Sequence, residues 1–508
     1  MRRAVIAGLV FAAAAAAQAQ AQTQVQTPAE GPVQAQTSPQ WVTEPRDWSA
    51  ALAEDARALH AIVIDSHPGV HDPANPEFRG RVDAGLAEAL ERAKTTTDAG
   101  GYWWAMRAFA ASFQDGHLGV SLKPQGGLPA RWPGFLTVYR GADQVVVERD
   151  EALGAATPPP GARLIDCDGT AAEALAAQRI GAFRGRWFLE SQRASLGDWQ
   201  FVNASNPWIS EMRACRFEVE GALRVYALDW RPIAAAELAE RRTRAARRFR
   251  PETGITLLED GGVWISTPNF DGDPRGQNHA VLTALIERMK TDQAVLRAAP
   301  YVVLDLRGNS GGSSHWSTQM AEALWGEAWL IDHPEPPIES VDWRASADNL
   351  MTIQGYFDQL TAAGESAERI GWAREIVEGM TAARAAGQPY FRDRVAAPEP
   401  RPETPSAPQR VAGAVYVLTD PVCASACLDA VDLWKAAGAI QIGRETSADT
   451  VYMDVRTADL PSGLSRLTLP MKVWRGRARG NNEPHSPARV FDGDMSDDAA
   501  LRAWVRGL

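Results

Sequence analysis

The sequence predicts a multi-domain protein of the α/β class, in which a helical region, a β-rich module and a βαβ core follow one another. Three observations support this order. Apolar residues recur at helical spacing between residues 41 and 113, short strands dominate 122–232, and strands alternate with helices from residue 254 onward. A chain of 508 residues is also too long for a single hydrophobic core.

The first 40 residues predict export. Residues 1–21 combine two arginines, a short apolar run and Ala-Gln-Ala repeats, which is the pattern of a secretory signal peptide. Residues 22–40 are Gln-rich and carry too few apolar side chains to form a core, so we expect a disordered linker. No other stretch has the roughly 18 apolar residues of a membrane span. We therefore expect a mature protein without an integral membrane segment, secreted or located in a bacterial periplasm.

The net charge limits the possible binding partners, and the number of cysteines indicates the redox compartment. The formal net charge of −11 disfavours nucleic acid as a partner. The four cysteines are Cys167, Cys215, Cys423 and Cys427, an even number that permits two disulfides in an oxidising compartment. We expect local pairing, Cys167 with Cys215 and Cys423 with Cys427. The alternative for Cys427 is that it is only a small buried residue on a helix.

Residues 41–121 predict a small antiparallel helical bundle. One apolar stripe comprises Leu52, Ala56, Leu59 and Val63, and another comprises Trp103, Met106, Phe109 (or Ala110) and Phe113. Between them, Pro76 opens a helix that continues through Ala93. The first helix ends in HPGVH, where His67 and His71 have the spacing of a metal pair. Pro68 and Gly69 break the helix between them, so we interpret the segment as a structural turn and expect no metal.

The third helix runs directly into FQDGHLGVSL. Asp115 and Gly116 form a turn dipeptide, and LGVSL starts a strand. His117 therefore lies on a loop between a rigid helix and a strand, where proteins often position catalytic side chains. The alternative is an ordinary surface histidine.

Residues 122–232 predict a β-rich domain of short strands. The piece PPGARLIDCDGTAAEAL reads as strand, turn and helix, and resembles part of a PDZ domain. Such a module binds an extended peptide by adding it to a sheet edge. A small β-rich domain without a ligand explains the pattern equally well.

Residues 233–508 predict a mostly parallel sheet with covering helices. A polar helical insertion at about 340–390 interrupts the alternation, and we interpret it as peripheral. The insertion would either cover a site as a lid or be a decorative insertion with no role at the site.

The stretch from Val415 to Gly438 carries a candidate nucleophile. A short apolar strand breaks at Asp420-Pro421 and restarts as a helix, with Ser425 at the junction. A serine there faces the unpaired N–H groups and the partial positive charge of the helix start. The alternative is a simple N-cap, because serine is favoured there for its hydrogen bond to the helix backbone.

A second serine competes for the chemistry. The segment GNSGG, from Gly308 to Gly312, matches the G-x-S-x-G elbow of α/β-hydrolases, with Ser310 as nucleophile. That interpretation predicts an esterase, with an acid and then a histidine downstream. His485 is the histidine that fits best.

The combination of motifs is similar to a known family. VVLDLRGNSGG, followed over a hundred residues later by VYVLTDPVCASAC and IQIGRET, resembles the tail-specific (C-terminal processing) proteases, including their tricorn-core branch. The resemblance implies a catalytic domain over 233–508 with a ClpP/crotonase-like βαβ core. It also implies a serine peptidase that acts on polypeptide substrates without a cofactor. Ser425 matches the family nucleophile.

The family comparison assigns the glycine-rich loop to the backbone machinery. Acyl transfer needs N–H donors aimed at the developing oxyanion, and glycines let the backbone approach the substrate. We expect Gly311 or Gly312 to supply one donor and Ala426 the other. Asp305, Arg307 and Asn309 are then interpreted as groups that brace the loop.

The general base is where this sequence departs from part of the family. Ser-Lys members carry a lysine about 25 residues after the serine, and this chain has Asp449 and Thr450 there. The tricorn-like branch uses a histidine that His117 matches, and an imidazole is a suitable base for a serine. We expect Glu483, near the chain end, to orient it, with Asp115 as the second choice. The tricorn pattern has a serine immediately before this histidine, where this chain has Gly116.

A non-catalytic protein on the same scaffold is the rival hypothesis. It would hold peptides or apolar ligands without cutting them. The sequence predicts neither the substrate nor the oligomeric state.

Overall fold

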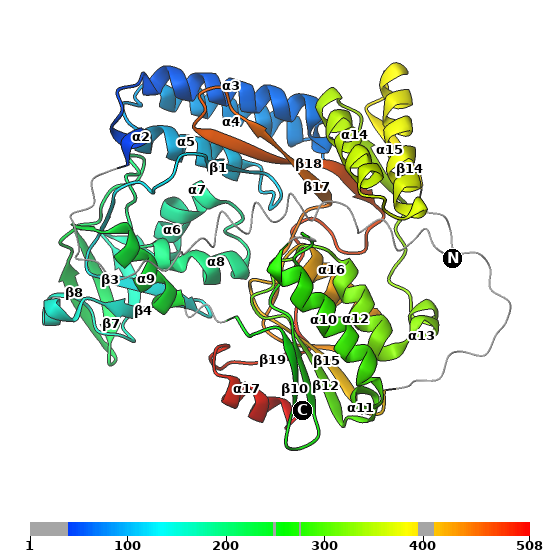
Figure 1. Ribbon diagram of the computed structural model, residues 1–508. Coiled ribbons are helices and arrows are strands. Elements are labelled where there is room, and N and C mark those ends of the chain that lie inside the picture. Colours follow the sequence, from blue (N-terminus) through cyan, green and yellow to red (C-terminus); the bar gives the residue numbers. More distant parts are fainter. Residues whose placement is uncertain (1–38, 247–249, 274–275, 395–410) are drawn as a thin grey trace.

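The computed structural model describes residues 39–246, 250–273, 276–394 and 411–508. The expected signal peptide, and nearly all of the expected linker, lie outside these residues. The described chain has a mixed α+β fold with a helical N-terminal region and several sheets, which confirms the predicted fold class (Figure 1). Across the described ranges, no helix combines the length and apolar character needed to cross a membrane.

The N-terminal region is helical, as predicted. Its elements are α2 (Gln40–Thr43), α3 (Trp48–Ser66), the short 3-10 helix η2 (Pro68–His71), α4 (Phe78–Ala93) and α5 (Ala99–Ser112). Asp47 and Asp98 cap α3 and α5 by accepting the backbone N–H groups of Ala50 and Gly101. The predicted stripe of α3 is fully buried, because it faces the other two long helices.

An antiparallel five-stranded sheet joins distant parts of the chain beneath these helices. Its strands are β1 (Gly119–Leu122), β13 (Ser340–Arg344), β14 (Tyr390–Arg394), β17 (Tyr452–Asp459) and β18 (Ser465–Arg475). The strand order is β1-β18-β13-β14, and β17 also pairs with β18. The predicted insertion therefore contributes two strands to this sheet, together with the helices α14 (Ala347–Ala362) and α15 (Ala367–Ala385).

The β-rich module lies below α2 and α5 in the view of Figure 1, at the end of the molecule away from α14 and α15. Its main sheet has the order β3-β4-β5-β7-β8, and β6 pairs with β5. The bounds are β2 (Ala130–Trp132), β3 (Phe135–Arg140), β4 (Asp143–Arg149), η3 (Glu151–Ala156), β5 (Arg163–Cys167), β6 (Thr170–Ala171), α6 (Ala172–Ala176), η4 (Ala177–Gly181), α7 (Ala182–Arg184), α8 (Glu190–Leu196), η5 (Gly197–Trp199), β7 (Ala214–Val219), β8 (Ala222–Ala227), β9 (Arg231–Ile233) and α9 (Ala235–Ala246). A disulfide joins Cys167 on β5 to Cys215 on β7, where the two residues face each other in register.

The βαβ core is a six-stranded sheet of order β10-β11-β12-β15-β16-β19. Every neighbouring pair is parallel except β10 with β11. The bounds are β10 (Gly254–Leu257), β11 (Val263–Ser266), α10 (Gln277–Thr291), α11 (Gln293–Ala298), β12 (Tyr301–Asp305), α12 (His315–Trp325), α13 (Glu327–Asp332), β15 (Ala414–Thr419), α16 (Ala426–Ala436), β16 (Ile440–Gly443), β19 (Arg489–Val490) and α17 (Asp498–Val505).

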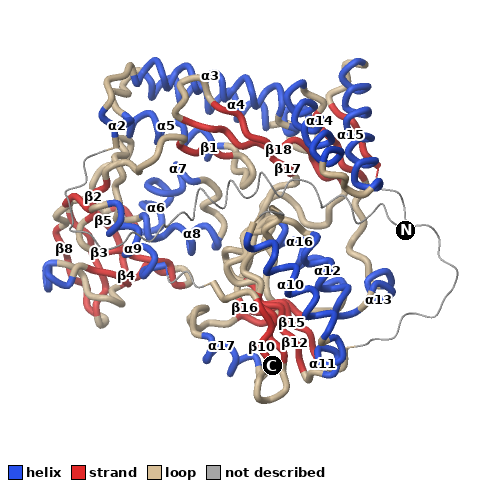
Figure 2. The backbone as a smooth tube through the Cα atoms, viewed as in Figure 1, coloured by secondary structure: helices blue, strands red, loops and turns tan. Residues whose placement is uncertain are grey.

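Helices cover both faces of this sheet. Helices α10, α12 and α16 lie on one side of the sheet and α17 on the other (Figure 2). Val302 and Leu304 of β12 belong to the core shared with α10, α12 and α16, whereas Val303, between them, belongs to the core shared with α17. A parallel strand buried on both faces reads as a continuous apolar run, which is why YVVLDL is recognisable in the sequence. β12 and β15 are adjacent and end level with each other, since Asp305 pairs with Leu418. The loops that follow them, 306–314 and 420–425, therefore start side by side.

Candidate active site

The turn before α16 holds Ser425 in an unusual backbone conformation. Its φ and ψ angles are 55° and −125°, a region that non-glycine residues rarely adopt. Its side chain makes no capping hydrogen bond to α16, so the N-cap alternative is not realised. A backbone held in such a conformation persists only where the surrounding structure fixes it, and such residues concentrate at functional sites.

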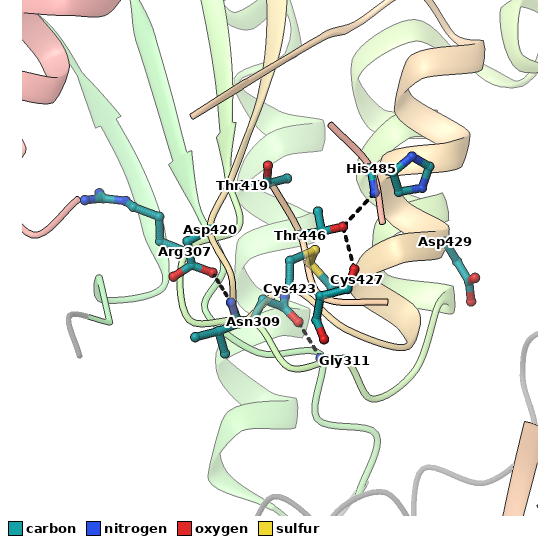
Figure 3. Close-up of a disulfide and its surroundings, with 12 residues drawn as sticks. Arg307, Asn309, Gly311, Thr419, Asp420, Cys423, Cys427, Asp429, Thr446 and His485 are labelled. Carbon is teal, nitrogen blue, oxygen red and sulfur yellow. Dashed lines mark hydrogen bonds between the residues drawn. A yellow bond between two sulfur atoms is a disulfide. The ribbon is translucent and has the colours of Figure 1, made fainter. Parts of the chain in front are cut away.

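A disulfide fixes this turn. Cys423 and Cys427 are bonded across Ser425, with 5.3 Å between their Cα atoms, and both side chains are fully buried (Figure 3). Cys427 lies in the first turn of α16, and the N–H of Cys423 donates to the carbonyl oxygen of Asp420. The disulfide thus joins the segment before Ser425 to the first turn of α16.

The glycine-rich loop packs directly against this serine. A Cβ atom on Gly311 would lie 2.8 Å from the Cβ of Ser425 and 3.0 Å from the nitrogen of Ala426. A Cβ on Gly312 would lie 1.9 Å from the carbonyl oxygen of Phe270. Both glycines also have positive φ angles, so a side chain is excluded by contact and by conformation.

The structure separates the roles of the two predicted oxyanion donors. The N–H of Gly311 donates to the Oδ1 of Asn309 at 2.9 Å, so this amide is already engaged. Within the described residues, the N–H groups of Gly312 and Ala426 have no hydrogen-bond partner. Of the candidates Gly311, Gly312 and Ala426, the last two therefore keep amides that are available to a substrate.

The three predicted bracing residues are all buried beneath the loop. Asn309 also donates through Nδ2 to the carbonyl oxygen of Thr267 at 2.8 Å. Arg307 forms a buried ion pair with Asp305 and donates to the carbonyl oxygen of Met495 at 2.6 Å. These contacts tie the loop to β11, β12 and the segment before α17.

Asp420 connects the glycine loop to the serine turn. Its Oδ2 accepts the N–H of Gly308 at 2.9 Å, and its Oδ1 accepts the N–H of Val422 at 3.0 Å. Burial raises the pKa of the Asp420 carboxyl to about 6, although both hydrogen bonds act in the opposite direction. One carboxyl group therefore fixes the distance between the two loops.

His117 lies in the turn between α5 and β1, as predicted. The Oδ1 of Asp115 accepts the backbone N–H of His117 at 2.8 Å and the hydroxyl of Thr450 at 3.0 Å. Its Oδ2 lies 3.6 Å from the Nε2 of His67. Burial alone would raise the pKa of the Asp115 carboxyl, but contacts with His67 and His117 outweigh it and lower the pKa.

His67 contacts the histidine turn through Asp115. Its ring is fully buried and stacks on Phe78 with 4.4 Å between centroids. Its Nδ1 accepts the N–H of Gly69 at 2.9 Å, so the Nε2 carries the proton and faces Asp115. Burial lowers the pKa of the His67 imidazole, although the neighbouring carboxyl groups of Asp115 and Asp72 act in the opposite direction. The structural interpretation of the HPGVH segment fits these contacts, and no group of residues suited to hold a metal ion occurs in the described chain.

Three carboxyl groups interact electrostatically with His117: those of Asp115 and Asp449, which are buried, and that of Asp454, which is half-buried. Burial raises the pKa of Asp449 and of Asp454, and the charge of His117 acts against that increase. The Nδ1 of His117 and the Oδ2 of Asp449 are both buried and lack a hydrogen-bond partner in the described residues. In the sequence, Asp449 is notable only because it stands, with Thr450, where the lysine of Ser-Lys members would fall.

Glu483 lies near this turn, but its carboxylate points elsewhere. The side chain is exposed and accepts the N–H of Gly480 at 2.8 Å. Its neighbour Asn482 donates through Nδ2 to the carbonyl oxygen of Gln114 at 2.9 Å, and through its backbone N–H to that of Asp449 at 2.7 Å. The structure thus brings the Glu483 segment to the His117 turn without forming the predicted hydrogen bond.

A short segment links the serine turn to the histidine turn. The N–H of Ser447 donates to the carbonyl oxygen of Cys423 at 2.9 Å, and Thr450 contacts Asp115 as described above. Three residue steps span at most about 11 Å. The turns that carry Ser425 and His117, 308 positions apart in the sequence, are therefore neighbours.

The competing serine lacks comparable surroundings. Ser310 is exposed, and its φ angle is not positive. The Nε2 of His485, its predicted partner, lies 3.0 Å from the Oδ1 of Asp432 on α16. The backbone of His485 is bonded to Thr446. The conformation of a nucleophile elbow therefore belongs to Ser425.

Comparisons with known proteins support this fold. No protein-family model and no curated protein matches the chain. Among solved structures, mature CPAF, a tail-specific protease, aligns with a TM-score of 0.56 and 13% identity over 87% of this chain and 93% of CPAF. The complex of mature CPAF with lactacystin aligns with the same TM-score and identity, over 91% of this chain and 98% of the CPAF chain. A serine-to-alanine variant of CPAF aligns with a TM-score of 0.56 and 12% identity over 87% and 93%.

These alignments cover nearly the whole of both chains, so the likeness extends over all the regions described above. The chain has the fold of a tail-specific protease, which confirms at the level of the fold the resemblance read from its sequence.

Proposed function

We propose that the protein is an exported serine peptidase that hydrolyses peptide bonds in polypeptide substrates through an acyl-enzyme on Ser425. The observation that carries the proposal is the conformation of Ser425, a serine held at a positive φ angle without a capping bond, against a loop that admits only glycine. The shared fold with CPAF supports the same class of activity. The expected signal peptide supports export to the periplasm or beyond, and the module over 122–232 is a candidate PDZ-like site for substrate peptides.

The catalytic steps follow from the chemistry of these groups. His117 takes the hydroxyl proton as the Oγ of Ser425 attacks the peptide carbonyl carbon. The N–H groups of Gly312 and Ala426 stabilise the negative oxygen of the tetrahedral intermediate. His117 then gives the proton to the leaving amine, and the peptide bond breaks. A water molecule, deprotonated by His117, hydrolyses the ester and restores Ser425.

The third member of the catalytic set is proposed to be Glu483. Its carboxylate would exchange the Gly480 N–H for the imidazole of His117, because the adjacent Asn482 already contacts the turn that ends in His117. Catalytic hydrogen bonds are often absent before substrate binds. The carboxyl groups of Asp115, Asp449 and Asp454 would favour the imidazolium that forms during the reaction.

The test compares two serine variants of the full exported chain. We expect a fluorophosphonate probe to label the wild type and Ser310→Ala equally, and not to label Ser425→Ala. Cleavage of a denatured protein substrate should follow the same order, with a loss of at least about a thousandfold in Ser425→Ala. Lactacystin, which was crystallised with CPAF, should compete with the probe. Labelling that persists in Ser425→Ala and disappears in Ser310→Ala would instead assign the protein to the esterases.

A non-catalytic binding protein is the second candidate, favoured by the position of the Glu483 carboxylate away from His117. It predicts that the wild type binds a denatured substrate, with no cleavage and no labelling by the probe.

A further inference from the structure

A cavity next to the histidine turn is lined by three arginines. It measures about 50 Å³ and lies between the end of α5, the segment leading into β1, and the segment that follows α7. Its charged lining consists of Arg107, Arg184, Arg186 and Asp115. The other lining residues are small, apolar or uncharged, and a Cβ on one of them, Gly119, would meet open space. The cavity exceeds the space that a single water molecule needs.

Arg107 is the unusual member of this group. It projects from α5, and in the described residues its guanidinium has no carboxylate partner and no hydrogen bond. It only lies near the ring of Trp103, 5.7 Å from the centroid. Although the side chain keeps some exposure to the cavity, burial lowers its pKa to about 10. The guanidinium of Arg107 is therefore a half-buried positive charge without a counter-charge in the described residues.

Arg186 reaches the same cavity from the β-rich module. Its guanidinium donates to the carbonyl oxygen of Ala448 and would contact a Cβ on Gly116 at 2.9 Å. Its backbone N–H donates to the side chain of Gln114. Arg184, two residues earlier, stacks on the ring of Trp199 at 3.9 Å from the centroid. Both arginines are thus fixed in place at the wall of the cavity.

The lining of the cavity contains more arginines than carboxylates. Asp115 is the single carboxylate among the lining residues, and its oxygens already face His117, Thr450 and His67. Asp449 interacts with Arg186 but lies outside the lining and forms ion pairs with Arg477 and Arg479. The cavity therefore holds an excess of guanidinium groups, whose planar donors suit carboxylate and phosphate oxygens.

We propose that this cavity binds a small anion or the carboxylate of a peptide, with Arg107 as the principal contact. An anion placed there would touch α5 and the module together, one element from each side of the cavity. Because Arg186 also lies against Gly116, occupancy would set the position of the His117 turn. The site is separate from Ser425, so its binding can be measured without proteolysis.

The first test measures binding of inorganic phosphate to the full chain carrying Ser425→Ala, at constant ionic strength. We expect the thermal midpoint to rise with phosphate concentration and to saturate. The rise should be lost in Arg107→Met and retained, with weaker affinity, in Arg107→Lys. Arg57→Met is the matched control, because Arg57 lies exposed on α3 and bonds only to the carbonyl oxygen of Ala53. A phosphate response that is absent, or identical in Arg107→Met, would overturn the proposal.

The second test distinguishes the two sources of the anion. Peptides that end in a free carboxylate are compared with the same peptides ending in a carboxamide, again in the Ser425→Ala chain. If a peptide terminus is the natural occupant, the carboxylate form should bind at least about tenfold more tightly, phosphate should compete, and Arg107→Met should remove the difference. If a free anion is the occupant, both peptide forms should bind alike and phosphate should bind alongside them. Binding of both peptides unaffected by phosphate, together with a failed first test, would leave the cavity without a ligand and the proposed peptidase activity untouched.

Discussion

The turn of Ser425 and the turn of His117 are built in different ways. Residues close in sequence shape the serine turn: a strand, a disulfide across four positions and the start of α16. The histidine turn depends on residues far along the chain, including His67, Arg186, Thr450 and Asn482. The nucleophile is therefore positioned by a locally cross-linked turn that also contacts the distant glycine loop and Ser447, whereas the turn of the base rests mainly on distant segments. Substitutions should affect the two turns differently.

The largest expected effect concerns the histidine side. Glu483→Gln should lower kcat by at least about a hundredfold, because the neutral amide orients the imidazole poorly. Stability should not change, since the side chain is exposed and the amide oxygen can still accept the Gly480 N–H. Glu259→Gln, at another exposed position, is the control for kinetics and thermal unfolding. An unchanged kcat in Glu483→Gln would leave the orientation of His117 to the buried aspartates.

The two disulfides provide a second comparison. The bridge in the module closes a loop of 48 positions and the bridge at Ser425 a loop of 4, so by chain entropy their loss costs about 4 and about 2 kcal/mol of unfolding free energy. Activity should show the opposite order. We expect Cys423→Ala with Cys427→Ala to lower kcat about tenfold or more, and Cys167→Ala with Cys215→Ala to leave kcat nearly unchanged. Denaturant unfolding and peptide cleavage measure the two effects. Equal losses of kcat would show that the bridge at Ser425 has no special role.

The pH dependence of stability tests the carboxyl group that joins the serine turn to the glycine loop. The pKa of Asp420 rises from 3.8 to about 6 on folding, so its protonated form favours the folded state. That contribution is complete below about pH 4 and is lost as the pH rises through about 6. Relative to Asp420→Asn, which does not titrate, the wild type should lose up to about 3 kcal/mol of unfolding free energy over this range. Urea unfolding at a series of pH values measures the difference, and a difference that is constant with pH would contradict the assignment.

The same contrast explains what could be predicted from the sequence. The helices of the N-terminal region and the βαβ core follow from apolar periodicity, and the motif around Ser425 is continuous in the chain. The pairing of β1 with β18 and the entry of β13 and β14 into that sheet follow from no local pattern. Gly116 is recognisable in the sequence as part of a turn dipeptide and as a departure from the serine of related proteins. In the structure, a Cβ at this position would lie 2.9 Å from the guanidinium of Arg186, a contact that no local pattern predicts.

The pairing of β1 with β18 has a consequence for the timing of activity during synthesis. β1 begins two residues after His117, and its hydrogen-bonded neighbour is the strand Ser465–Arg475 near the end of the chain. A ribosome that has completed the serine, the glycines and the histidine has still not delivered the strand on which the histidine rests. The nascent polypeptide is therefore expected to remain inactive until residues 465–475 have been synthesised and can pair with β1.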